Sequence, residues 1–105
     1  MEPRVVAIVV AREGGEHLSR TLRAIDAQTR VPDIVVAVDN GSRGSVSTSL
    51  AGFSGTVLTL EHREDFGEAV RRAVASISDS SDTGLLWLLA QDSDPDPTAL
   101  ERLAG

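Results

Sequence analysis

The stretch RVVAIVVA (residues 4–11) decides the fold class, because it is an unbroken apolar run rich in β-branched residues. A strand with one face in water alternates apolar and polar residues, whereas a strand buried on both faces is apolar throughout. Strands of the second kind belong to parallel sheets that helices cover on both sides. The stretch therefore predicts a central strand of an α/β domain.

Helical spacing of apolar residues marks two segments of the remaining chain. The first segment, residues 14–29, holds Leu18, Leu22 and Ile25, and the sequence RVPD after it ends the predicted helix. The second predicted helix has an apolar face that consists of Phe66, Ala69, Val70, Ala73, Val74 and Ile77.

Short apolar runs predict three more strands, which polar segments separate. The strands are expected over residues 34–38 (IVVAV), 56–61 (TVLTLE) and 85–89 (LLWLL), the last of them buried. Residues 40–49 (NGSRGSVSTS), with a weak helical turn, and residues 78–84 (SDSSDTG) are predicted loops. The order strand, helix, strand, loop, strand, helix and strand predicts a mostly parallel sheet of about four strands flanked by helices.

Composition excludes several function classes. The chain of 105 residues has the length of one domain, and it contains neither Cys nor Lys. Thiolate chemistry and a phosphate-binding loop with its lysine are therefore excluded. A net charge of -6 disfavours nucleic acid as a partner. No apolar run has the length of a membrane span, so we expect a cytoplasmic protein, or one at the cytoplasmic face of a membrane if the chain is longer.

Polar residues follow three of the predicted strands, whose carboxyl ends share one edge of a parallel sheet. They are Arg12 and Glu13 after the first strand, Asp39 and Asn40 after the second, and Gln91, Asp92 and Asp94 after the fourth. Ligands of such sheets bind beyond this edge, where the strand order reverses. Turn chemistry is the other interpretation of Asp39, and Asp96 is expected to cap a last helix that begins with Pro97.

Asp92, Asp94 and Asp96 stand at alternate positions, and neighbouring carboxylates repel one another unless a cation lies among them. Mg²⁺ and Mn²⁺ prefer carboxylate oxygens and water, and they bridge carboxylates to diphosphates. A calcium loop does not fit, because Pro97 replaces its glycine and Leu103 replaces its last glutamate. The pattern therefore indicates a Mg²⁺ or Mn²⁺ ion that recruits a nucleotide.

Three stretches of the chain carry a resemblance to a known family. They are VVAIVVAREGGEHLSRTLRAIDAQTRVPDIVVAVDNGS (residues 5–42), DFGEAVRRAV (65–74) and LLWLLAQDSDPDPTALERL (85–103). They resemble the opening segment, the Gly-Phe-Gly segment and the D-x-D strand end of family 2 glycosyltransferases, and QDS is similar to the DQDS of rhamnosyl- and galactofuranosyl-type members. The resemblance implies that residues 1–105 are the N-terminal, nucleotide-sugar-binding half of a Rossmann-like GT-A domain.

This resemblance implies roles for the polar residues of the predicted edge. Asp39 would accept a hydrogen bond from the ring N–H of uracil or thymine, and Asp92, together with Asp94, would hold Mn²⁺ or Mg²⁺. Ala90 stands where many relatives have Asp, which leaves the D-x-D register open, and Asp65 stands where relatives have Gly. The nucleotide-binding residues that the resemblance implies are Ala11, Arg12, Glu13, Asp39, Asn40, Phe66, Gly67 and Gln91.

The implied reaction is inverting transfer of a sugar from a UDP or dTDP donor to a hydroxyl of a carbohydrate or lipid-linked acceptor, as in cell wall polysaccharide biosynthesis. A divalent cation would stabilise the charge on the leaving diphosphate. The general base is expected beyond Gly105, since His17 and His62 are predicted surface residues. We therefore expect a truncated and inactive half, whose open sheet edge favours a homodimer.

Two other function classes remain open. The chain fits a noncatalytic module that binds nucleotides or a partner. A receiver domain also has a parallel sheet with acidic strand ends, but its chemistry requires a lysine, and this chain has none.

Overall fold

The computed structural model describes residues 4–77 and 83–104, and a four-stranded sheet forms its centre. The strands are β1 (Arg4–Ala11), β2 (Ile34–Asn40), β3 (Thr56–Leu60) and β4 (Thr83–Ala90). Their order across the sheet is β3-β2-β1-β4, and every pair of neighbours is parallel. The helices are α1 (Glu16–Asp26), α2 (Ser45–Ser49), α3 (Phe66–Ala75) and α4 (Ala99–Ala104).

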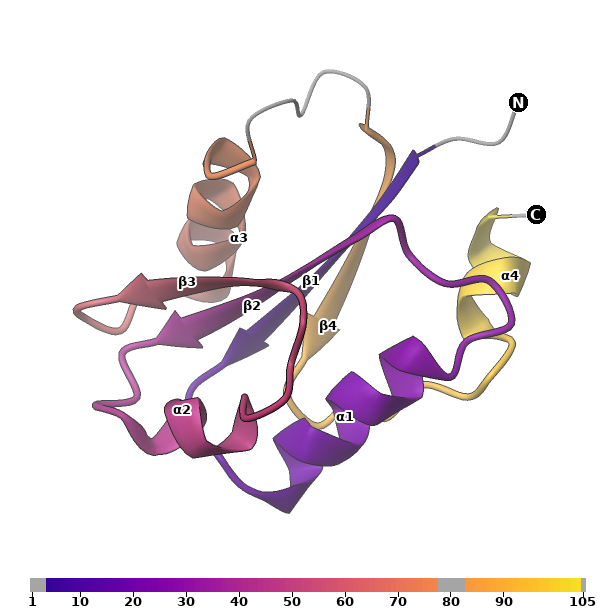
Figure 1. Ribbon diagram of the computed structural model, residues 1–105. Helices are drawn as coiled ribbons and strands as arrows, with labels where there is room; N and C mark the ends of the chain where they lie inside the picture. Colours follow the sequence, from indigo (N-terminus) through magenta and orange to yellow (C-terminus); the bar gives the residue numbers. More distant parts are fainter. Residues whose placement is uncertain (1–3, 78–82, 105) are drawn as a thin grey trace.

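Helices cover both faces of this sheet (Figure 1), with α3 on one side and α1, α2 and α4 on the other. Side chains alternate along β1, so Val5, Ala7 and Val9 pack under α1, while Val6 and Ile8 pack under α3. All five side chains are fully buried, which an unbroken apolar run requires. The predicted α/β class, with parallel strands flanked by helices in a Rossmann-like arrangement, is confirmed.

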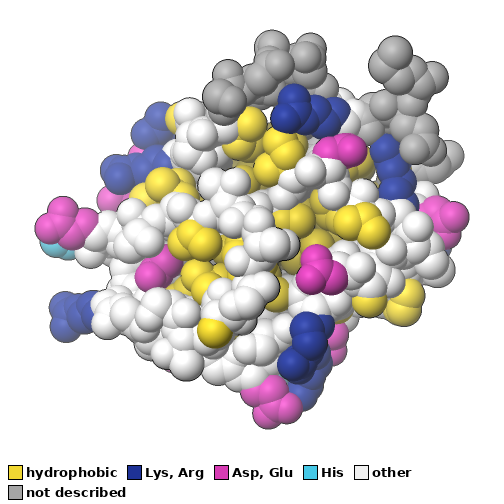
Figure 2. Space-filling model, viewed as in Figure 1, with side chains coloured by type: hydrophobic (Ala, Val, Ile, Leu, Met, Phe, Trp, Pro, Cys, Tyr) yellow, Lys and Arg dark blue, Asp and Glu magenta, His cyan; other side chains and the backbone are white. Residues whose placement is uncertain are grey.

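The prediction that the run LLWLL is buried is wrong for one face of β4. Leu86 is 41% exposed and Leu88 is 45% exposed, whereas Trp87 and Leu89 on the other face are buried. The reason is the strand order, because β4 forms an edge of the sheet and α3 packs on β1 and β2. β3 forms the opposite edge, and Figure 2 shows that side of the molecule, with hydrophobic side chains in its middle and charged ones mainly around them.

Several element boundaries differ from the predicted ones. β2 continues to Asn40, so its last two residues are polar, and β4 already begins at Thr83. Residues 78–82 of the predicted polar loop lie outside the described residues. α4 begins at Ala99, because the Asp96 carboxylate accepts hydrogen bonds from the N–H and hydroxyl of Thr98 and holds a turn before the helix.

Within the described part of the chain, none of the helices combines the length and the apolar character that crossing a bilayer requires.

Candidate functional site

The strand order reverses at β1, because the chain places β2 and β3 on one side of it and β4 on the other. Such a reversal opens a crevice at the carboxyl ends of the two strands that flank it. Here these are β1, which is followed by Arg12 and Glu13, and β4, which is followed by Gln91 and Asp92.

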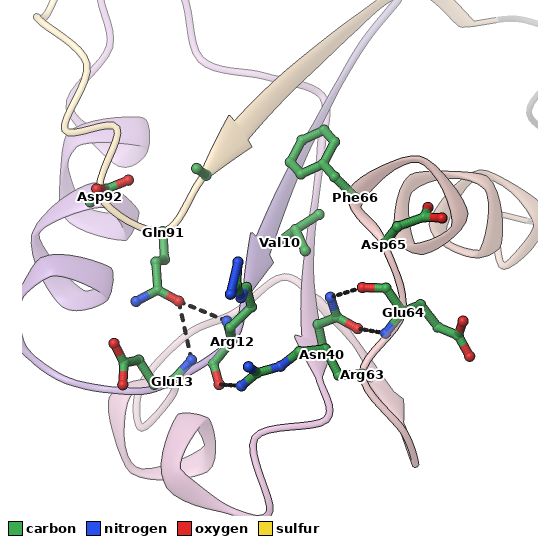
Figure 3. A pocket seen from close by; sticks show the side chains of 11 residues that line it. Val10, Arg12, Glu13, Asn40, Arg63, Glu64, Asp65, Phe66, Gln91 and Asp92 are labelled. Carbon is green, nitrogen blue, oxygen red and sulfur yellow. Dashed lines mark hydrogen bonds between the residues drawn. The ribbon is translucent and has the colours of Figure 1, made fainter.

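A cavity of about 680 Å³ opens at this edge (Figure 3). Figure 3 shows Glu13, Gln91 and Asp92 toward one end of it, and Asn40 and Glu64 toward the other. Its lining residues are Val10, Arg12, Glu13, Asn40, Arg63, Glu64, Asp65, Phe66, Ala90, Gln91 and Asp92. Six of the predicted site residues therefore meet here, namely Arg12, Glu13, Asn40, Phe66, Gln91 and Asp92.

Gln91 links the turns on the two sides of the reversal. Its side-chain oxygen accepts hydrogen bonds from the backbone N–H of Arg12 at 2.7 Å and of Glu13 at 3.1 Å. Two orphan donors beyond β1 are thereby satisfied by a residue beyond β4. This leaves the amide N–H₂ of Gln91 as the part of the side chain that can contact a ligand.

Asn40 links the end of β2 to the segment before α3. The side chain is 1% exposed, its amide donates to the carbonyl of Glu64 at 2.9 Å, and its oxygen accepts from the Glu64 N–H at 2.8 Å. This reciprocal pair fixes the loop that carries Arg63 against the edge of the sheet. Asn40 therefore shapes the cavity chiefly through Glu64.

The N-terminus of α3 brings an aromatic ring to the cavity. Asp65 caps this helix, because its carboxylate accepts a hydrogen bond from the N–H of Glu68 at 2.8 Å. Phe66 follows at the first helical position and is 45% exposed, which corrects its predicted place on the buried face of the helix. Gly67 does not line the cavity, and a Cβ there would meet only the Asp65 carboxylate at 3.6 Å.

Asp39 lies on the other face of the sheet from this cavity. It pairs in register with Ala11, which is fully buried under α1, and its side chain is 6% exposed. One carboxylate oxygen accepts a hydrogen bond from the N–H of Ser42 at 3.0 Å. This hydrogen bond closes a turn, which is the other role that the sequence allows for Asp39. Neither Ala11 nor Asp39 lines the cavity, and their contacts with a nucleotide stay predictions.

The two residues of the D-x-D pattern differ in their surroundings. Asp92 lines the cavity, whereas Asp94, at a φ of 40°, does not. The backbone N–H of Asp94 donates to the Thr21 hydroxyl at 3.0 Å, which holds this turn against α1. Of the two carboxylates, only that of Asp92 belongs to a residue that lines the cavity.

The residues that line the cavity have a formal charge of 2 − 4 = −2, from Arg12 and Arg63 against Glu13, Glu64, Asp65 and Asp92. Of these carboxylates, that of Glu64 pairs with Arg72 and that of Asp65 caps α3. Among the residues that the structure describes, no group of three or more His, Cys, Asp or Glu side chains could hold a metal. The carboxylates that line the cavity fit a hard cation that takes one or two ligands from the protein and its other ligands from water and phosphate oxygens.

Arg63, Glu64 and Val10 were not singled out from the sequence. Arg63 follows the third strand. It could have been predicted as a site residue, because the carboxyl ends of parallel strands meet at one edge of the sheet. Glu64 enters the site through its backbone bonds to Asn40, for which the sequence carries no signal. His17 and His62 are exposed, as predicted.

No protein-family model and no curated protein sequence matches this chain. Among solved structures, it is similar to a nucleotidyl transferase from Methanothermobacter thermautotroptrophicus, with a TM-score of 0.73 and 16% sequence identity. The match covers 94% of this chain and 56% of that structure, so the chain spans little more than half of its length. At this identity the similarity shows a shared fold.

Proposed function

We propose that this chain binds a nucleoside-diphosphate sugar of the UDP or dTDP type, as the nucleotide-binding part of a family 2 glycosyltransferase with the GT-A fold. The observation that carries the proposal is Asp92, which lines the cavity at the edge where the strand order reverses. Nucleotides bind to open α/β sheets at this place.

The charge of the cavity supports a cation as cofactor. A diphosphate that approaches the carboxylates of Glu13 and Asp92 is repelled unless positive charge accompanies it. Asp92 would hold Mg²⁺ or Mn²⁺ at this end of the cavity, and Asp94, two residues further along the chain, is the second expected ligand. When bound, the ion supplies Lewis-acid stabilisation of the leaving diphosphate.

Other cavity residues suit the remaining parts of a donor. The exposed ring of Phe66 offers an apolar face against which a base or a sugar packs. The guanidinium groups of Arg12 and Arg63 can donate to ribose or phosphate oxygens. Donor binding is the role that the proposal assigns to this chain, and none of its described residues is assigned as the general base for the acceptor hydroxyl.

Nucleotidyl transfer is the second candidate function, because the similar solved structure carries that name. The substrate would then be a nucleoside triphosphate, and the products would include pyrophosphate. A noncatalytic nucleotide-binding module is a third possibility that the same cavity allows. Affinity for UDP-sugars compared with UTP, and release of pyrophosphate, separate these functions.

The experiment is a calorimetric titration of UDP and dTDP with and without Mn²⁺, on the wild type and on three variants of the acidic segment. Nucleotide affinity should rise with Mn²⁺, because each partner supplies charge or ligands that the other lacks. Asp92→Asn should abolish this rise, and Asp94→Asn should weaken it if the D-x-D register is the shifted one. Asp96→Asn is the matched control, because Asp96 caps a turn and does not line the cavity.

Two results would contradict the proposal. One is nucleotide affinity that is the same with and without Mn²⁺ in the wild type. The other is a full response to Mn²⁺ in Asp92→Asn, which would assign Asp92 to loop structure alone.

A further inference from the structure

A second cleft, of about 420 Å³, lies where β2 and β3 end. It adjoins the cavity described above, because Arg63 lines both. Its lining residues are Gly41, Ser42, Arg43, Glu61, His62 and Arg63. Donor binding, as proposed above, uses Arg63 but neither Arg43 nor His62.

The two walls of this cleft are loops that touch through their backbones. Gly41 has a φ of 71°, and a Cβ at this position would lie 2.5 Å from the backbone nitrogen of Arg63. A residue with a side chain there would push the two loops apart. Arg43, from the loop after β2, and Arg63, from the loop after β3, both line this cleft.

The two pockets differ in the formal charge of their lining residues. The chain has a net charge of -6, and the main cavity has a formal charge of −2 from the residues counted above. The residues that line the second cleft include Arg43, Arg63 and one carboxylate, that of Glu61, which gives 2 − 1 = +1 with His62 neutral. The lining of the second cleft is therefore less acidic than that of the main cavity, although Arg63 belongs to both.

The arginines of the cleft keep unused donors. Elsewhere in the described chain, arginines such as Arg20 and Arg72 pair with carboxylates. Arg43 makes no hydrogen bond or ion pair with the described residues, and Arg63 donates through one nitrogen to the carbonyl of Arg12 at 3.3 Å. Guanidinium groups carry several donors in a fork that matches a phosphate.

We infer that this second cleft is an anion subsite, in which Arg43 and Arg63 donate hydrogen bonds to a phosphoryl group without a metal. The inference goes beyond donor binding, because it does not depend on Asp92 or on a cation. The phosphoryl group belongs either to the nucleotide in the neighbouring cavity or to a second phosphorylated molecule, and the two sources share one chemistry of recognition.

The test is a titration of inorganic phosphate into isotope-labelled protein without divalent metal, at constant ionic strength, followed through the backbone amide signals. Shifts at Gly41, Ser42 and Arg43 should saturate together. Arg43→Gln and Arg63→Gln should each weaken binding by about tenfold, the loss expected from removing a charge-assisted pair of hydrogen bonds. Arg23→Gln, on α1, removes the same charge away from the cleft and should change little.

The inference is overturned if Arg43→Gln binds phosphate like the wild type, or if Arg23→Gln weakens binding equally. Asp92→Asn should leave the phosphate titration unchanged, so failure of the subsite and failure of the proposed donor site give different results. Repeating the titration in saturating UDP and Mn²⁺ distinguishes the two sources. Undiminished phosphate binding assigns the subsite to a second molecule, and competition assigns it to the nucleotide.

Discussion

The side-chain oxygen of Gln91 lies 2.7 Å from the backbone nitrogen of Arg12, although the two residues are 79 positions apart in the chain. This bond joins the turn after β4 to the turn after β1, across the point where the strand order reverses. The same oxygen binds the N–H of Glu13. One amide therefore sets the distance between the two turns that form one end of the cavity.

Gln91→Ala should destabilise the fold by about 0.5–1.5 kcal/mol, since both acceptor contacts disappear while water reaches the freed N–H groups. Gln91→Glu keeps an acceptor in the same place and is the control. Urea denaturation measures the free energy of unfolding of each variant. Equal stability of wild type and Gln91→Ala would show that the two turns hold their positions without this contact.

Asn40→Ala should cost more, about 1–3 kcal/mol, because it leaves the backbone N–H and carbonyl of Glu64 without partners next to a buried position. Asn40→Asp keeps the acceptor and loses the donor, so its stability should lie between that of the wild type and that of Asn40→Ala. Urea denaturation again gives the values. A loss as small as that of an exposed surface substitution would contradict the fixing role of this side chain.

The fold was largely predictable, because the decisive signals are local. The β-branched run of β1 is buried on both faces, as its pattern predicts. The exposure of Leu86 and Leu88 was not predictable from the run LLWLL, since an edge strand and a central strand have the same composition there. Whether the run LLWLL forms an edge strand or a central strand depends on the strand order. The strand order in turn depends on how the whole chain folds.

The edge that holds the cavity was predictable in the same way, but the face was not. Arg12, Asn40 and Gln91 meet there because the carboxyl ends of parallel strands share one edge. Asp39 is adjacent to Asn40 in the chain and points to the opposite face. The sequence shows this alternation, but it does not show on which face a cavity opens.

Phe66→Ala should weaken UDP binding by about 1–3 kcal/mol, the range for loss of stacking between a base and an aromatic ring. The free energy of unfolding should change by less than about 0.5 kcal/mol, as for other exposed positions. Phe53→Ala is the matched control, because Phe53 packs against the core on the other face of the sheet and should lower stability with little effect on affinity. Unchanged UDP affinity in Phe66→Ala would remove the ring from the proposed site.

Glu68 makes the stability of α3 depend on pH. Arg71 and then Arg72 donate hydrogen bonds to its carboxylate, and together they lower the pKa of Glu68 from 4.5 to about 2. The folded protein therefore binds this proton more weakly than the unfolded chain, and the stabilisation is complete above pH 4.5 and lost as the pH falls toward 2.

Thermal unfolding of the wild type and of Glu68→Gln across this pH range tests this linkage. The wild type should be the more stable at neutral pH, and the difference should shrink as the pH falls below 4.5. High salt should also reduce it, because the pairs are exposed. A difference that stays constant down to the acid limit of the folded state would show that the ion pairs do not stabilise α3.

Gly41 and Gly44 form a matched pair that separates two costs of adding a side chain. Both have positive φ, at 71° and 94°, so alanine at either position is strained by about 1–2 kcal/mol. At Gly44 the new Cβ meets nothing within 4 Å, whereas at Gly41 it meets the Arg63 backbone nitrogen at 2.5 Å. Gly44→Ala should therefore lose only the strain, and Gly41→Ala should lose clearly more and should shift the amide signals of the loop that carries Arg63. Equal losses in urea denaturation would mean that the loops after β2 and β3 separate easily, and that the cleft between Arg43 and Arg63 is not held by their contact.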